Sequence, residues 1–133
     1  MSDPNVTSTP EMRLEVVILP IADFDRSIKF YTEKMGFHLD HDVVYGEMRI
    51  VQLTPVGSVC SIVLGSGPLA NGMTPGSIKG LHLVVQNAQQ IHDLFTERGI
   101  EVSEVEDMGG IKYVHLSDPD GNSWEMQEIG ARP

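Results

Sequence analysis

Apolar positions along the chain change their spacing in a regular order. Residues 14–19 (L-E-V-V-I-L) form a short β-branched run, which is typical of a strand. The next apolar residues recur at spacings of three and four, which predicts a helix with one apolar stripe: Phe24, Ile28, Tyr31 and Met35. Short apolar runs separated by turn residues follow and predict strands over 37–45, 48–53 and 59–64. This order describes one βαβββ module.

The same order returns in the second half of the chain. Residues 91–100 (I-H-D-L-F-T-E-R-G-I) resemble residues 28–37 (I-K-F-Y-T-E-K-M-G-F) in a helical segment that ends at a glycine. Around this second helix the pattern predicts strands over 80–85, 100–105, 111–116 and 122–129. We therefore expect an α+β fold in which two paired βαβββ modules form a curled mixed sheet around a cleft.

The domain boundaries follow from composition. Residues 1–12 lack apolar periodicity and are predicted to be a disordered N-terminal segment. Residues 13–130 are predicted to form a single domain, divided into module one (13–65), a linker rich in Gly, Pro and Ser (66–79) and module two (80–130).

Charge and cysteine content restrict the partners and the compartment. The formal net charge of −10 argues against nucleic acid or an anionic membrane as a partner, because both are bound through cationic surfaces. No apolar run approaches the roughly 20 residues of a membrane helix. The single cysteine, Cys60, excludes an internal disulfide, and the N-terminus lacks the features of a secretory signal. We expect a cytoplasmic protein.

Three segments resemble the vicinal oxygen chelate superfamily, which includes glyoxalase I, extradiol dioxygenases and bleomycin-resistance proteins. They are A-D-F-D-R-S-I-K-F-Y (22–31), G-L-H-L-V-V-Q-N (80–87) and L-S-D-P-D-G-N-S-W-E-M-Q-E-I (116–129). The resemblance implies paired modules that enclose a cleft, a small organic molecule as ligand, and a homodimer. It is weak for activity, because one fold of this kind serves many chemistries.

The resemblance also implies a place for a metal site. Metal-dependent members have a His on the first strand and a Glu on the last strand of each module. Counted from the motifs, the four positions fall on Val16, on Ser61 or Val63, on Gly80 and on Glu125. Glu125 is thus the clear match, and His82, two residues after Gly80, shares the face of that position. We therefore predict no cofactor. The alternative is a divalent metal held by Glu125 and His82 with substitute ligands such as His38, His41 or His115.

Strand alternation assigns the remaining side chains to the two sheet faces. His82 and Glu125 are expected to be cross-strand neighbours on the cleft side, with His115 and Tyr113 beside them; these four are the candidate catalytic residues. The candidate ligand-binding residues are Val16, Ile18, Ser61, Val63, Val84 and Gln127. Cys60 is expected on the helix side, where it matches Trp124 in the repeat, as a small core residue.

These residues support three functional hypotheses. The first is a metal-independent lyase, isomerase or cyclase that moves a proton on an organic metabolite through His82 and Glu125. The second is a non-catalytic protein that binds and sequesters a drug. The third is a metal-dependent enzyme, glyoxalase-like or dioxygenase-like, with substitute ligands. The His82–Glu125 pair is also what an ordinary solvated groove would contain, so the sequence leaves the choice open.

Overall fold

The computed structural model describes residues 8–129. Of the predicted disordered segment, residues 1–7 lie outside the described residues, whereas 8–12 are exposed and have no regular secondary structure. Module one contains β1 (Val16–Pro20), α1 (Phe24–Lys29), the π-helical segment η1 (Phe30–Lys34), β2 (His38–Tyr45), β3 (Met48–Thr54) and β4 (Ser61–Gly65). After the short 3-10 helix η2 (Gly67–Ala70), module two contains β5 (Leu81–Val85), α2 (Ala88–Glu97), β6 (Glu106–Met108), β7 (Ile111–Ser117) and β8 (Ser123–Glu128).

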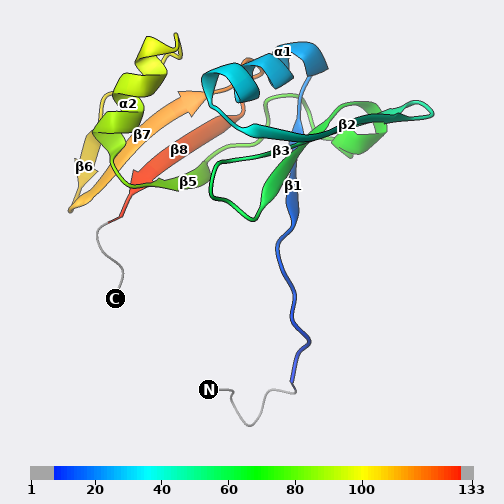
Figure 1. The fold of residues 1–133 in the computed structure, drawn as a ribbon, viewed down its shortest axis with the longest axis horizontal. Helices are drawn as coiled ribbons and strands as arrows, with labels where there is room; N and C mark the ends of the chain where they lie inside the picture. Colours follow the sequence, from blue (N-terminus) through cyan, green and yellow to red (C-terminus); the bar gives the residue numbers. More distant parts are fainter. Residues whose placement is uncertain (1–7, 130–133) are drawn as a thin grey trace.

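Each module has its own four-stranded mixed sheet in the described part of the chain. The strand orders are β1-β4-β3-β2 and β5-β8-β7-β6. In both sheets the first strand runs parallel to the last, and the other pairs are antiparallel. Figure 1 shows α1 and α2 along the same side of the molecule, each over its own sheet. The α+β fold with two βαβββ modules is therefore confirmed.

The helix boundaries have the local causes that the sequence indicated. Asp23 caps α1 by accepting a 3.0 Å hydrogen bond from the Arg26 N–H, and Asn87 caps α2 by accepting one of 2.9 Å from the Gln90 N–H. The first helical stretch ends at Gly36, whose φ of +78° is a conformation that glycine adopts without steric cost.

One predicted strand is wrong. Residues 100–105 form no strand, and the second strand of module two is β6 instead. Ile100 is buried and Val102 and Val105 pack against the core, but the step from 102 to 105 breaks the alternation of period two. The segment is tied to β7 by a 2.9 Å bond from the Ser103 N–H to the His115 carbonyl, and the regular ladder begins only at Glu106.

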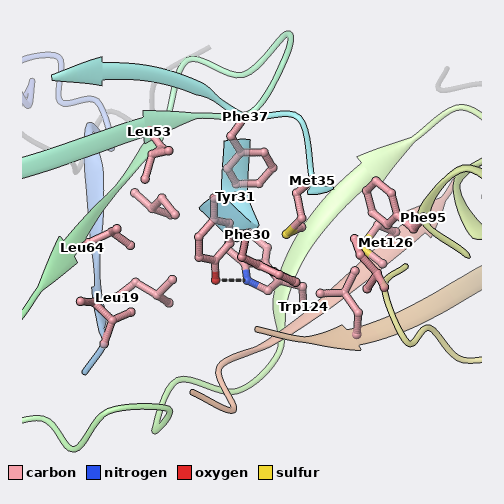
Figure 2. Close-up of a cluster of buried hydrophobic side chains, with 14 of the residues drawn as sticks. Leu19, Phe30, Tyr31, Met35, Phe37, Leu53, Leu64, Phe95, Trp124 and Met126 are labelled. Atoms are coloured by element: carbon pink, nitrogen blue, oxygen red, sulfur yellow. Dashed lines mark hydrogen bonds between the residues drawn. The ribbon is translucent and has the colours of Figure 1, made fainter. Parts of the chain in front are cut away.

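A single hydrophobic core joins the two modules. Tyr31, Phe37 and Trp124 meet at its centre, with the Phe37 and Trp124 rings 5.6 Å apart and nearly perpendicular. Figure 2 shows the indole of Trp124 directed at the Tyr31 hydroxyl, to which it donates a 2.9 Å hydrogen bond. On the module-two sheet, the residues that alternation assigned to the helix side are in this core or against it: Leu81, Leu83, Val85, Trp124 and Met126. Within residues 8–129, no helix is long and apolar enough to cross a membrane.

Candidate functional site

A row of three polar side chains crosses the module-two sheet. Residue 82 pairs with residue 125 in the parallel β5–β8 ladder, and residue 125 pairs with residue 115 in the antiparallel β7–β8 ladder. Residues paired across neighbouring strands point to the same face of a sheet. His82, Glu125 and His115 therefore lie at one level, on the face opposite the helix.

The Glu125 carboxylate bridges the two imidazoles of this row. Its Oε2 lies 3.0 Å from His82 Nε2, and its Oε1 lies 3.3 Å from His115 Nδ1. The other ring nitrogen of His115, Nε2, is 3.5 Å from Glu106 Oε2. Two carboxylates and two imidazoles thus alternate across four strands, and all four side chains are reached by solvent. The predicted cross-strand contact between His82 and Glu125 is confirmed.

Gln127, Tyr113 and Val84 form the next level of the same face. Gln127 pairs with Val84 on one side and with Tyr113 on the other. Its Oε1 is 3.0 Å from His82 Nδ1, so both ring nitrogens of His82 have a polar neighbour in the protein. These contacts hold the imidazole in one orientation while leaving half of the side chain exposed.

The strand register relates this row to module one. Gln52 pairs with Val63 as His115 pairs with Glu125. Val63 pairs in turn with Ile18, as Glu125 pairs with His82. The apolar pair Ile18–Val63 therefore stands in module one where the His82–Glu125 pair stands in module two.

Module one has its own polar row, one level away from the Ile18–Val63 pair on the same face of the sheet. The Ser61 hydroxyl bonds the Thr54 hydroxyl, which donates to Asp40 Oδ2. Asp40 is an extra residue at a β-bulge between Leu39 and His41, and a bulge re-aims the inserted side chain. Hydrogen bonds from Thr54 and from the His38 ring, at 2.7 Å, hold the pKa of Asp40 below its usual value.

The residues present do not make a metal centre of the kind that the family uses. Within residues 8–129, no group of three or more His, Cys, Asp or Glu side chains is arranged to hold a metal ion. Each oxygen of Glu125 faces an imidazole, and the pair at the same register in module one, Ile18 and Val63, offers no ligand atom. His38 contacts Asp40 on β2 of module one and so does not join the His82–Glu125 pair.

Three cavities border the polar row of module two. The largest, about 750 Å³, follows the β7 edge and is lined by His115, Glu125, Ser103 and residues on the helix side of the sheet. Two cavities of about 260 Å³ each flank β5 and share Pro55, Ser58, His82 and Leu83. Of the predicted ligand-binding residues, Ser61 and Val84 border the smaller cavities. The others line none of the three: Val16, Ile18, Val63 and Gln127.

Sequence reasoning missed Glu106 as a member of the site. The residue lay between two predicted strands, so it had no assigned face. Its register opposite Tyr113 on β6 places it on the same face as His115. The signal available in the sequence was two acidic residues, at 104 and 106, at the end of the predicted strand over 100–105.

Comparisons with known proteins agree with the fold. The profile of the glyoxalase/bleomycin resistance protein/dioxygenase superfamily matches residues 13–126. Among solved structures, the antibiotic-binding protein TnmS3 from Streptomyces sp. CB03234 is 27% identical, with a TM-score of 0.85 over 92% of this chain and 100% of that one. A glyoxalase/bleomycin resistance protein from the same strain is 28% identical (TM-score 0.78; 87% of this chain, 100% of that one).

A third structure is a superfamily member from Sphaerobacter thermophilus DSM 20745. It is 26% identical, with a TM-score of 0.80 over 90% of this chain and 98% of that one. No curated protein matches the chain significantly. The similar structures thus include a protein whose described role is to bind an antibiotic.

Proposed function

The chain belongs to the glyoxalase/bleomycin resistance protein/dioxygenase superfamily, and on that premise we propose that it binds a small organic molecule without a metal. The proposed site is the face of module two that carries His82, Glu125 and His115. One observation carries the proposal: these three side chains stand in a single row on three adjacent strands, and the carboxylate in the middle orients both imidazoles.

The row is unnecessary for the stability of the sheet. The core lies on the opposite face, where Trp124 and Met126 alternate with Glu125 and are buried. Exposed ion pairs of this kind contribute little to folding, about 0–1 kcal/mol. A polar row that is pre-oriented and solvent-accessible is instead suited to a hydroxyl or carbonyl group of a ligand, because the orientation cost is already met.

The similarity to an antibiotic-binding protein supports a binding role. That relative is aligned over its full length, so the fold that positions its ligand is present here in full. We infer a ligand of the same general class, a drug-sized organic compound. We also infer a homodimer, in which the partly buried Val16 and Ile18 of one copy form an apolar wall opposite the row of the other.

Proton transfer is the second candidate function, and the bridging carboxylate is the observation that favours it. A His held by Glu125 through Nε2 is oriented to take up or release a proton at a bound substrate. In that case His82 and Glu125 act as the acid–base pair, and His115 and Tyr113 contact the substrate, in a lyase, isomerase or cyclase reaction.

A screen of antibiotics and microbial metabolites by ligand-observed NMR tests both candidates. We expect at least one compound to bind the wild-type protein, and to bind His82→Ala about tenfold more weakly, the loss of one hydrogen bond of about 1.4 kcal/mol. His92→Ala is the matched control, since His92 lies on α2. A compound recovered unchanged after long incubation supports binding alone, and conversion that His82→Ala abolishes supports the enzyme. Binding equally strong to His82→Ala would refute the site.

A further inference from the structure

A crevice separates the two modules beside the proposed site. β1 and β5 are each the edge strand of their sheet, and no strand of the described chain pairs with both. The cavity of about 260 Å³ at this junction is lined by module one on one side and by β5 on the other: Leu14, Val17, Pro55, Ser58, Cys60, Ser61, Ile62, Leu81, His82, Leu83 and Trp124. Most of these side chains are apolar.

The crevice opens into the hydrophobic core instead of onto a polar surface. Ile62 and Trp124 belong to the core, and Leu81 and Leu83 pack against it. The indole of Trp124 is held in place by its hydrogen bond to Tyr31. A flat, fixed and apolar wall of this kind is suited to an aromatic or aliphatic group.

Several exposed apolar side chains lie on the segments that border the crevice. Leu14 is 71% exposed, and Val56 and Val59 in the loop before β4 are 89% and 92% exposed. Val84, also exposed, continues the apolar surface along β5 towards the second cavity of about 260 Å³. Exposed apolar surface beside a cavity is typical of a place that a ligand or a partner covers.

We propose that this crevice is the subsite for the apolar part of the ligand, so that the protein recognises an amphiphilic compound. The inference rests on the proposed function, since the polar group of the same compound would meet the row beginning at His82, which borders both cavities. The volume fits a ring system: a cavity of about 150 Å³ holds benzene, and this one is about 260 Å³. The continuity of the crevice with His82 favours a small molecule over a peptide strand.

The chain contains two reporters at the subsite. Its single tryptophan, Trp124, and its single cysteine, Cys60, both line the crevice. A neutral fluorescent amphiphile, N-phenyl-1-naphthylamine, serves as the probe. We expect it to bind in a 1:1 ratio, to quench Trp124 by energy transfer, and to slow the reaction of Cys60 with a disulfide reagent.

Two matched variants assign the effect to the crevice. Leu14→Asp places a charge at the crevice, and Met12→Asp makes the same change nearby at a residue that is 82% exposed and lines none of the three cavities. Neither side chain is buried, so both variants are expected to fold. We expect probe affinity to fall about fivefold in Leu14→Asp and to stay unchanged in Met12→Asp.

Several outcomes would overturn the subsite. These are no binding of the probe, binding that leaves Trp124 and Cys60 unaffected, or equal affinity in the two variants. Protection of Cys60 that rises with protein concentration in the absence of probe would show that a second copy covers the crevice instead. The proposed function fails separately, through compounds whose binding is insensitive to His82, so the two failures are distinguishable.

Discussion

The Tyr31 hydroxyl donates a 2.7 Å hydrogen bond to Asp118 Oδ2 in the buried seam between the modules. The same hydroxyl accepts from the Trp124 indole, and the same carboxylate oxygen accepts from the Asn122 amide. Asp118 Oδ1 meanwhile accepts three backbone N–H groups of the turn at 120–122. The two motifs most typical of the superfamily, the first helix and the D-P-D-G-N turn, therefore hold one module against the other.

Removing the Tyr31 hydroxyl should destabilise the protein markedly. Tyr31→Phe leaves the buried Trp124 N–H without its acceptor and removes a donor from Asp118. We expect the free energy of unfolding to fall by about 1–3 kcal/mol, measured by urea denaturation. Tyr45→Phe is the control, because Tyr45 is exposed at the end of β2. A loss no greater than that of Tyr45→Phe would show that the seam does not depend on this hydrogen bond.

The same residue should make stability sensitive to alkaline pH. Burial, followed by the nearby Asp118 charge, raises the pKa of Tyr31 above its ordinary value of 10.0. Because the folded-state pKa is the higher one, this stabilisation is complete below about pH 10 and is lost as the pH rises further. Between about pH 9 and pH 11, wild type should lose more unfolding free energy than Tyr31→Phe. Parallel pH profiles would contradict this.

The contact between His82 and Glu125 could be predicted from the sequence, whereas the Tyr31–Asp118 contact between the modules could not. Strand alternation and the internal repeat depend on local order, and they placed the His82–Glu125 pair and the helix-facing residues correctly. The Tyr31–Asp118 bond joins positions 87 apart in sequence, and no periodicity reports such a contact. The β-bulge at Asp40 and the broken alternation before β6 shift side chains by one residue, which a pattern of period two does not detect.

The bulge leads to a prediction at acid pH. Hydrogen bonds from Thr54 and His38 lower the pKa of Asp40, so its stabilising effect is present above about pH 4 and is lost as the pH falls through the folded-state pKa. Asp40→Asn should therefore show a shallower loss of unfolding free energy than wild type on acidification. Glu47→Gln, at the β2–β3 turn, removes an exposed carboxylate that has no hydrogen bond or ion pair within residues 8–129, and it should follow wild type. If the unfolding free energy of Asp40→Asn falls with pH as steeply as that of wild type, the prediction is contradicted.

The bridging role of Glu125 can be tested without any ligand. Both imidazoles of the row contact its carboxylate, so Glu125→Ala should shift the ring-nitrogen resonances of His82 and His115 together. His92 contacts Asp93 on α2 and should be unaffected. Nitrogen-detected NMR of the histidine rings provides the measurement. A shift confined to one ring would show that the row is not coupled through Glu125.

Metal binding separates the proposed function from the metal-dependent chemistries of the superfamily. His82 and Glu125 contact each other, and the equivalent positions in module one are the apolar residues Ile18 and Val63. Two ligands that already pair with each other hold a divalent ion poorly, because structural and catalytic sites use three or four protein ligands. We therefore expect elemental analysis after incubation with Zn, Ni, Mn or Fe to show far less than one ion per chain. We also expect Glu125→Ala to retain as little. Near-stoichiometric metal that is lost in Glu125→Ala would replace the binding proposal with a glyoxalase-like or dioxygenase-like centre. In such a centre His115, which contacts Glu125, would be the third ligand.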